Sequence, residues 1–174
     1  MANKDNIDSL LEPFQVALKL EQEGRRLFLE AAQKTTSKLA RQTFEFLAAE
    51  EDKHIERIEK FYESLRQSGG KDCPKTEDST ADEKLESFNV MLEGLKDQYE
   101  VTSSDIEAYR LALEFETGAE EFYEEKLAEA DSEGIRRFYQ WLIDEETMHS
   151  RLLRSCLRFV EDPAEWFRRR KSAT

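Results

Sequence analysis

Apolar residues recur every three or four positions along four long stretches of the chain, the spacing that places side chains on one face of an α-helix. In the first half, a capping-box pattern at Ser9 and Glu12 and a polar turn at 35–37 delimit two such stretches. We therefore predict one helix over about 10–34 and a second that ends at Ser68, before two glycines. Their inward faces are predicted to carry Phe14, Ala17, Leu18, Glu21, Phe28 and Ala32, and then Phe44, Leu47, Ala48, Glu51, Ile55 and Ile58.

The second half of the chain has the same organisation. A capping-box pattern at Ser104 and Glu107 predicts the start of a third long helix, which stops near Asp131. A fourth helix follows and is predicted to end at Asp162 and Pro163. The inward faces of these two helices are predicted to carry Tyr109, Ala112, Leu113, Glu116, Ala119, Tyr123 and Leu127, and then Ile135, Tyr139, Leu142, Ile143, Glu146, His149, Leu153 and Val160.

The two pairs of helices are separated by a long connection over about 68–103, rich in Gly, Ser, Thr, Asp and Lys. Within it, Thr80 and Glu83 form another capping-box pattern before an apolar stretch, which predicts one short helix. Two helical hairpins joined by one long crossover are typical of the ferritin-like four-helix bundle. We predict this all-α fold, as a single domain over 1–174.

The fourth helix has a second row of apolar residues: Phe138, Trp141, Met148, Leu152 and Phe159. One inward stripe does not require them, so part of this helix is predicted to pack against the crossover or against another subunit. A homodimer is our hypothesis for the assembly.

Composition and charge exclude several classes of partner. The chain of 174 residues has a formal net charge of −13, which repels nucleic acid and anionic lipid. The basic run at 168–171 is interpreted as a solvated tail, and no stretch is apolar for long enough to span a membrane. Cys73 and Cys156 do not form a disulfide framework, and no leader sequence is recognisable, so we expect a cytoplasmic protein.

The two halves of the chain are related by an internal duplication. Residues 17–54 align with 112–149 at a constant offset of 95 without a gap, and 10 of these 38 positions are identical. The identical pairs include Ala17 with Ala112, Leu18 with Leu113, Glu21 with Glu116, Leu47 with Leu142, Glu50 with Glu145, Glu51 with Glu146 and His54 with His149. The residues with coordinating side chains are therefore among those that the halves share.

The chain has only two histidines, and each ends a Glu-x-x-His motif, at Glu51 to His54 and at Glu146 to His149. A spacing of three places both members of a motif on one helix face. Each His also has a Glu 33 residues upstream, at Glu21 and Glu116, on the apolar face of the preceding helix. Folding each hairpin antiparallel brings its two Glu to the same height, roughly 22 Å from the turn.

Four carboxylates in an apolar interior repel one another and lose their hydration, unless cations neutralise them. Two divalent metal ions would do so, and carboxylates with one imidazole per metal suit Fe, Mn or Zn. The alternative for any single residue is a solvated Glu or a core His. The six residues together predict a di-metal site, with two Fe ions as the first choice.

Glu50 and Glu145 compete as ligands, because each lies four residues before a His. On the second helix, Glu50 shares a polar strip with Lys53 and Arg57, whereas Glu51 shares a face with Leu47 and Ile58. We therefore predict Glu51 as the ligand, and Glu146 by the same repeat.

The sequence resembles the rubrerythrin-like branch of the ferritin-like di-iron carboxylate proteins, over nearly its whole length. The resembling stretches are ALKLEQEGRRLF, FEFLAAEEDKHIERI, ALEFETGAEEFY, FYQWLIDEETMHSRLL and the terminal EDPAEWF. The resemblance implies that Glu51 and Glu146 bridge both metals. It also implies that Glu21 with His54 completes one metal, and Glu116 with His149 the other.

The chain departs from this family in three places. It has no Cys-x-x-Cys pairs for a rubredoxin-type iron, so the resemblance implies a separate electron donor protein. Ala119 stands where rubrerythrins that carry a rubredoxin domain have an extra Glu, associated with metal movement during peroxide turnover. Phe28 replaces a frequent Tyr and is interpreted as core, whereas Tyr123 keeps the matching position and is a candidate partner of the ligands.

Three functions compete at this point. The first is a di-iron oxidoreductase whose substrate is peroxide or O2. The second is iron handling, with ferroxidase loading, storage or delivery and no external substrate. The third is a bundle that binds metal only for stability. Assembly size distinguishes iron storage from the other two functions, because mineral storage needs a hollow shell. Redox activity distinguishes the oxidoreductase from a bundle that binds metal only for stability.

Overall fold

The structure, a computed structural model, describes residues 4–68, 81–95 and 100–173. Over these residues it contains six helices and no strand: α1 Lys4–Lys34, α2 Lys38–Ser68, α3 Ala81–Gly94, α4 Ser103–Glu129, α5 Glu133–Glu161 and α6 Pro163–Ala173. The prediction of an all-α fold is confirmed. Cys73 and Thr80, which the sequence analysis considered, lie outside the described residues.

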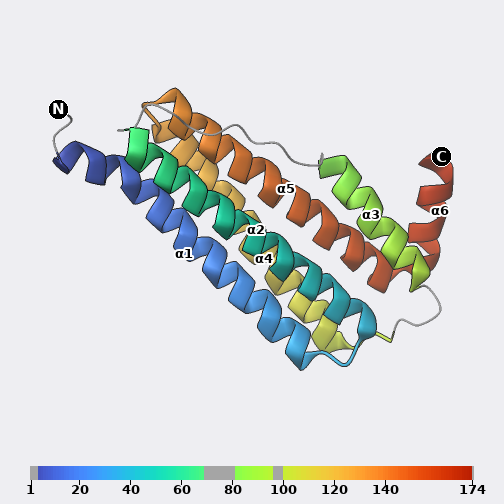
Figure 1. Ribbon diagram of the computed structural model, residues 1–174. Helices are drawn as coiled ribbons and strands as arrows, with labels where there is room; N and C mark the ends of the chain where they lie inside the picture. Colours follow the sequence, from blue (N-terminus) through green and yellow to red (C-terminus); the bar gives the residue numbers. More distant parts are fainter. Residues whose placement is uncertain (1–3, 69–80, 96–99, 174) are drawn as a thin grey trace.

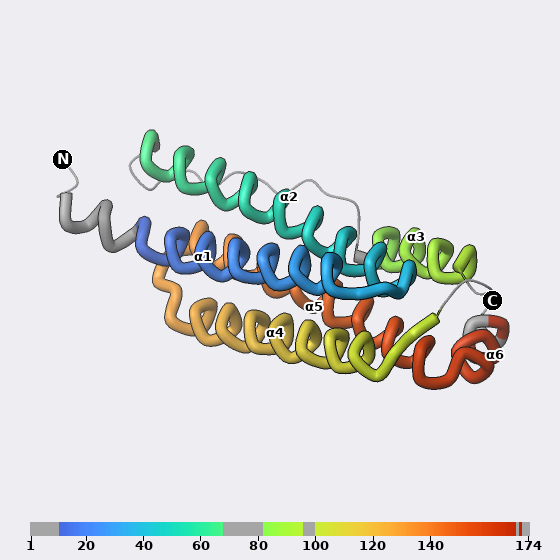
Figure 2. Tube along the Cα trace, turned by 90° about the horizontal axis from the view of Figure 1, so that it is seen from below, coloured from blue at the N-terminus to red at the C-terminus, as the bar shows by residue number. Residues whose placement is uncertain are grey.

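Four of these helices form a bundle of two antiparallel hairpins, α1 with α2 and α4 with α5 (Figure 1). The end of α2 and the start of α4 lie at opposite ends of the bundle (Figure 2). The short helix α3 lies between α2 and α4 in the sequence and packs beside α5 (Figure 1). The ferritin-like bundle predicted from the hairpin pattern is therefore the observed fold.

The apolar core is divided into two parts along the bundle axis. One part contains Phe28, Phe44 and Leu153, and the other contains Phe14 and Phe138. In α1, α2 and α4, the predicted coordinating residues lie between the positions that contribute to the two parts; in α5, Glu146 lies between them and His149 directly follows Met148 of the first part. The site therefore lies near the middle of the bundle, with packed apolar side chains above and below it.

The second apolar row of α5 is buried inside the chain. Phe138 contacts Phe14 with ring centroids 4.2 Å apart, and Met148, Leu152 and Phe159 share a core cluster with Phe88 and Leu92 of α3. The prediction that the crossover covers part of this helix is confirmed. The row gives no support for a second subunit, and the homodimer stays a prediction that light scattering would test.

Two predicted helix starts were wrong. Helix α1 begins at Lys4, so Ser9 lies inside it, and a capping-box pattern arises easily by chance in a chain rich in Glu. Helix α4 begins at Ser103, and its capping box is formed by Thr102 and Asp105 rather than by Ser104 and Glu107. Ser and Thr both occur as N-cap residues, so local pattern alone does not choose between Thr102 and Ser104.

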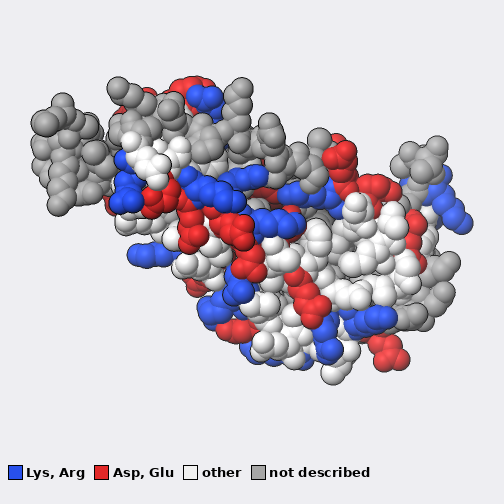
Figure 3. Space-filling view, in the orientation of Figure 1, with Lys and Arg blue, Asp and Glu red and all other residues white. Residues whose placement is uncertain are grey.

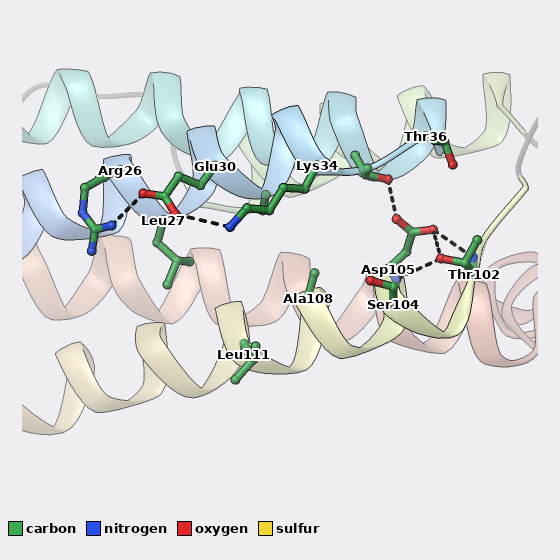
Figure 4. Close-up of a pocket in the computed structure, with 12 residues that line it drawn as sticks. Arg26, Leu27, Glu30, Lys34, Thr36, Thr102, Ser104, Asp105, Ala108 and Leu111 are labelled. Atoms are coloured by element: carbon green, nitrogen blue, oxygen red, sulfur yellow. Dashed lines mark hydrogen bonds and ion pairs between the residues drawn. The ribbon is translucent and has the colours of Figure 1, made fainter.

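Asp105, the second residue of the capping box of α4, also connects the two hairpins through hydrogen bonds. One of its carboxylate oxygens accepts hydrogen bonds from the backbone and hydroxyl of Thr102, at 2.8 and 2.7 Å. The other accepts from the hydroxyl of Thr35, in the turn after α1 (Figure 4). The groove drawn in Figure 4 lies between the C-terminal end of α1 and the N-terminal end of α4. None of the six predicted site residues lines it.

The C-terminal basic run belongs to a helix, which the sequence analysis missed. Asp162 ends α5 and caps α6, accepting from the backbone of Glu165 at 2.9 Å, and Pro163 occupies the first position of α6. Trp166 is buried and donates to Ser155 at 3.1 Å. Arg168 and Arg169 are exposed and pair with Glu165, so their side chains are solvated as predicted.

Charged side chains of both signs lie next to one another on the face drawn in Figure 3. Among the described helices, none combines the length and the apolar character that crossing a membrane would require.

Candidate metal centre

All six predicted ligands come from the middle of the four bundle helices and are buried. Glu21 lies on α1, Glu51 and His54 on α2, Glu116 on α4, and Glu146 and His149 on α5. Each is at most 2% exposed. Charged residues are almost never buried to this extent unless they are paired or bind a metal.

The structure brings these residues into two overlapping clusters. One contains Glu21, Glu51, His54 and Glu146, and the other contains Glu51, Glu116, Glu146 and His149. Within each cluster, one ligand atom from every residue lies within 4.8 Å of the others, close enough for a common metal ion. Glu51 and Glu146 belong to both clusters, which is the arrangement that the family resemblance implied.

The two histidines are arranged alike, as the duplication predicts. The Nδ1 atom of His54 lies 2.9 Å from Glu21, and that of His149 lies 3.1 Å from Glu116. The imidazole rings stack on each other with centroids 5.1 Å apart and an interplanar angle of 16°. The same nitrogen of each ring therefore faces the carboxylates, which leaves Nε2 pointing away from them.

The gathered carboxylates perturb one another strongly. Burial, assisted by the neighbouring charge of Glu51, raises the pKa of Glu21 to about 7. Burial and the charges of Glu116 and Glu21 raise the pKa of Glu146 well above its usual range. Burial also acts on Glu51, but hydrogen bonds from His149 and His54 outweigh it and lower that pKa. Without added positive charge, the four carboxylates do not all ionise near neutral pH.

The residues fit a pair of divalent metal ions. Glu116 Oε2 and Glu146 Oε2 are buried and have no hydrogen-bond partner within the part of the chain that the structure describes. Two divalent cations would balance four carboxylates and give these oxygens partners. Carboxylate and imidazole donors without thiolate suit Fe, Mn or Zn, and the donor set does not choose among them.

Three residues that the sequence analysis compared with the family differ in their contacts: Tyr123, Phe28 and Ala119. The Tyr123 hydroxyl donates a hydrogen bond to Glu21. Burial and the nearby Glu21 raise the pKa of Tyr123 well above its usual range, so the phenol stays protonated and keeps this bond. Phe28 is fully buried and packs near Phe44, as predicted for a core residue. Ala119 is also buried and offers no ligand.

Glu50 and Glu145 lie outside both clusters, which agrees with the choice of Glu51 and Glu146. The sequence analysis placed Glu50 on a polar strip, but the structure buries its side chain, which is 2% exposed. It pairs with Lys53, as expected, and also with Lys84 of α3. The crossover helix covers this side of the bundle and turns a polar strip into a buried ion-pair network.

Lys84 is the polar residue near the centre that the sequence analysis missed. It precedes Phe88 and Leu92 at intervals of four, so it begins the buried face of α3. A lysine that opens an apolar stripe is a weak signal of a buried cation. Its partners could not be named without knowing where α3 packs.

A four-helix bundle with buried, overlapping Glu and His clusters belongs to the class of metal-binding carboxylate proteins built on the ferritin-like fold. The chain itself belongs to the rubrerythrin family: the family model described as Rubrerythrin matches residues 12–157, which is the ferritin-like di-iron domain. Comparison with curated proteins and with solved structures found no match.

Proposed function

We propose that the protein is a di-iron oxidoreductase that reacts with O2 or peroxide. The observation that carries this proposal is the pair of overlapping clusters that share Glu51 and Glu146. Glu21 and His54 would complete one iron position, and Glu116 and His149 the other. When bound there, two adjacent ferrous ions would supply the two electrons that reduce O2 or peroxide.

The chain's own residues hold and shield this site. The four carboxylates are pre-arranged by the bundle, so binding metal requires no large rearrangement of the backbone. Tyr123 orients Glu21 through its hydrogen bond. Packed apolar side chains on both sides, including Phe44 and Phe138, exclude bulk water and limit access to small molecules.

A separate protein is proposed as the electron donor, because this chain has no Cys-x-x-Cys pair to hold a second iron centre. Ala119 leaves the ligand set at six residues. The extra carboxylate associated with metal movement in other rubrerythrins is missing at this position, which favours O2 over peroxide as the better oxidant.

The proposal is tested by anaerobic titration with ferrous iron, followed by mixing with O2 or peroxide. We expect two iron ions per chain and their rapid oxidation, measured by near-ultraviolet absorbance in a stopped-flow instrument. Glu51→Gln should abolish both, because Glu51 contributes to both clusters. Glu59→Gln, an exposed residue of the same helix, should behave like the wild type.

Failure to bind two iron ions, or binding without oxidation by either oxidant, would contradict the proposal. Iron handling without an external substrate would appear as continued iron uptake beyond two per chain in a large shell. Light scattering on the same samples therefore separates the two functions by assembly size.

A further inference from the structure

Lys84 is a largely buried cation that lies outside the two clusters and contacts one residue from each half of the duplication. It lies in the first turn of α3 and its side chain is only 14% exposed. Its Nζ atom lies 2.9 Å from Glu50 on α2 and 2.8 Å from Glu145 on α5. These two glutamates are equivalent in the internal repeat, and each directly precedes one of the shared carboxylates, Glu51 or Glu146.

Glu50 and Glu145, which lie outside both clusters, are held by ion pairs to Lys84. Lys84 and Lys53 supply two positive charges, and Glu50 and Glu145 supply two negative charges, so the network is neutral by itself. Buried carboxylates that are already paired gain little by moving to a metal ion. The four inner carboxylates lie instead beside the two histidines.

The repeat is broken at one position of this network. Lys53 pairs with Glu50, but the residue equivalent to Lys53 in the second half is Met148, which is buried in the apolar core. Met148 offers Glu145 no charge, and Glu145 instead contacts Lys84 at 2.8 Å and His54, whose Nε2 atom lies 3.4 Å away, with the charge of Arg57 also nearby. His149 Nε2 has no such partner in the described part of the chain.

This difference matters because the partner of the nitrogen that faces away from a metal affects how well the other nitrogen binds the metal. When Nε2 of a histidine donates to a carboxylate, the ring orientation and the tautomer are held, and Nδ1 becomes a better ligand. His54 has this support through Glu145, which Lys84 holds in place. Among the described residues, the polar contacts of His149 lie on the Nδ1 side of its ring.

We propose that Lys84 is a positioning residue that makes the two metal positions unequal. Through Glu145 it holds the His54 ring, so the position formed with Glu21 and His54 binds its metal first and more tightly. This inference rests on the proposed function, since it concerns the same metal centre.

The test is anaerobic calorimetric titration of the full chain with ferrous iron. We expect the wild type to bind two ions in two resolved steps. Lys84→Met should weaken the tighter step about tenfold, the lower end of the range for partners of a ligating histidine, and leave the weaker step within about threefold. Lys84→Arg, which keeps the charge, should recover most of the loss.

Matched variants assign the steps and control for charge. His149→Ala should keep the tighter step and His54→Ala should lose it. Lys60→Met removes a positive charge from the exposed side of α2 and should change neither step. If Lys84→Met does not fold, as circular dichroism would show, Glu145→Gln carries the same test with an isosteric change.

Two equal binding steps in the wild type would overturn the inference. So would equal weakening of both steps by Lys84→Met, or the same result for Lys84→Met and Lys60→Met. A wild type that binds no iron would contradict the proposed function as well. Two bound ions with an unchanged Lys84→Met variant would contradict only the inference.

Discussion

At the scale of single residues, the duplicated halves use the same ligands but surround them differently. Position 28 of the first half is the core residue Phe28, whereas the equivalent Tyr123 donates a hydrogen bond to Glu21. Lys53 draws Glu50 into an ion pair, whereas Met148 leaves Glu145 beside His54. Both differences act on the metal position that contains Glu21 and His54.

Replacing Tyr123 by Phe tests the first of these differences. The change removes one hydrogen bond to a carboxylate, an interaction of about 1.5 kcal/mol, so we expect ferrous iron to bind about tenfold more weakly at the tighter step. Anaerobic titration measures this affinity. Tyr109→Phe is the matched control, because the Tyr109 hydroxyl pairs with Thr43 away from the clusters. Equal affinities of the two variants would show that the bond does not support Glu21.

At the scale of helices and turns, the hairpins are joined by a small polar network as well as by the apolar core. Asp105 caps α4 and accepts a hydrogen bond from Thr35 in the turn of the other hairpin. Burial opposes its ionisation, but the hydrogen bonds from Thr35 and Thr102 lower the pKa of Asp105. The carboxylate is therefore the form that stabilises the fold.

The two alternative capping boxes of α4 can be distinguished by their effect on stability. Asp105→Asn should lower the free energy of unfolding by about 1 kcal/mol at pH 7, measured by urea denaturation. The loss should shrink below about pH 4, because a carboxylate with a lowered pKa contributes its stability only where it is ionised.

Glu107→Ala, in the capping box that the sequence predicted, should leave the unfolding midpoint almost unchanged, because Glu107 is exposed. If this variant destabilised the protein more than Asp105→Asn, the helix would begin where the sequence analysis placed it.

At the scale of the whole molecule, the bundle buries four carboxyl groups at one place, and burial raises the pKa values of Glu21 and Glu146, so these two groups lower the stability at neutral pH unless cations are bound. Removing the metal should lower the melting temperature. Metal held at 1,000 times its dissociation constant contributes about 4 kcal/mol to the free energy of unfolding. Whether a substitution of a predicted ligand raises or lowers the melting temperature should therefore depend on whether metal is bound.

Glu146→Gln provides this test. Without metal it should raise the melting temperature at pH 7 above that of the metal-free wild type, because Glu146, whose pKa is raised by burial in the fold, must take up a proton on folding, whereas Gln need not. With ferrous iron it should lower the melting temperature, because a shared ligand is lost. Scanning calorimetry with and without chelator measures both, and Glu124→Gln, an exposed change on α4, is the control. The same direction of change in both conditions would contradict a metal centre at these residues.

The sequence predicted the helices and the gathering of six Glu and His side chains because both depend on short-range regularities. A spacing of three places Glu51 and His54 on one face, and equal distances from a turn bring Glu21 and Glu51 to one height. Capping signals were less specific, since several candidates lay within a few residues of each other. The starts of α1 and α4 were therefore misplaced by a few residues.

The sequence by itself thus determined two half-sites, one in each hairpin, because each depends only on helix periodicity and on one turn. The tertiary structure alone decided how the half-sites combine. Packing one hairpin against the other places Glu51 and Glu146 in both clusters. Packing of the crossover helix places Lys84 between Glu50 and Glu145. These contacts join residues far apart in the chain, and periodicity along one helix carries no information about its neighbour.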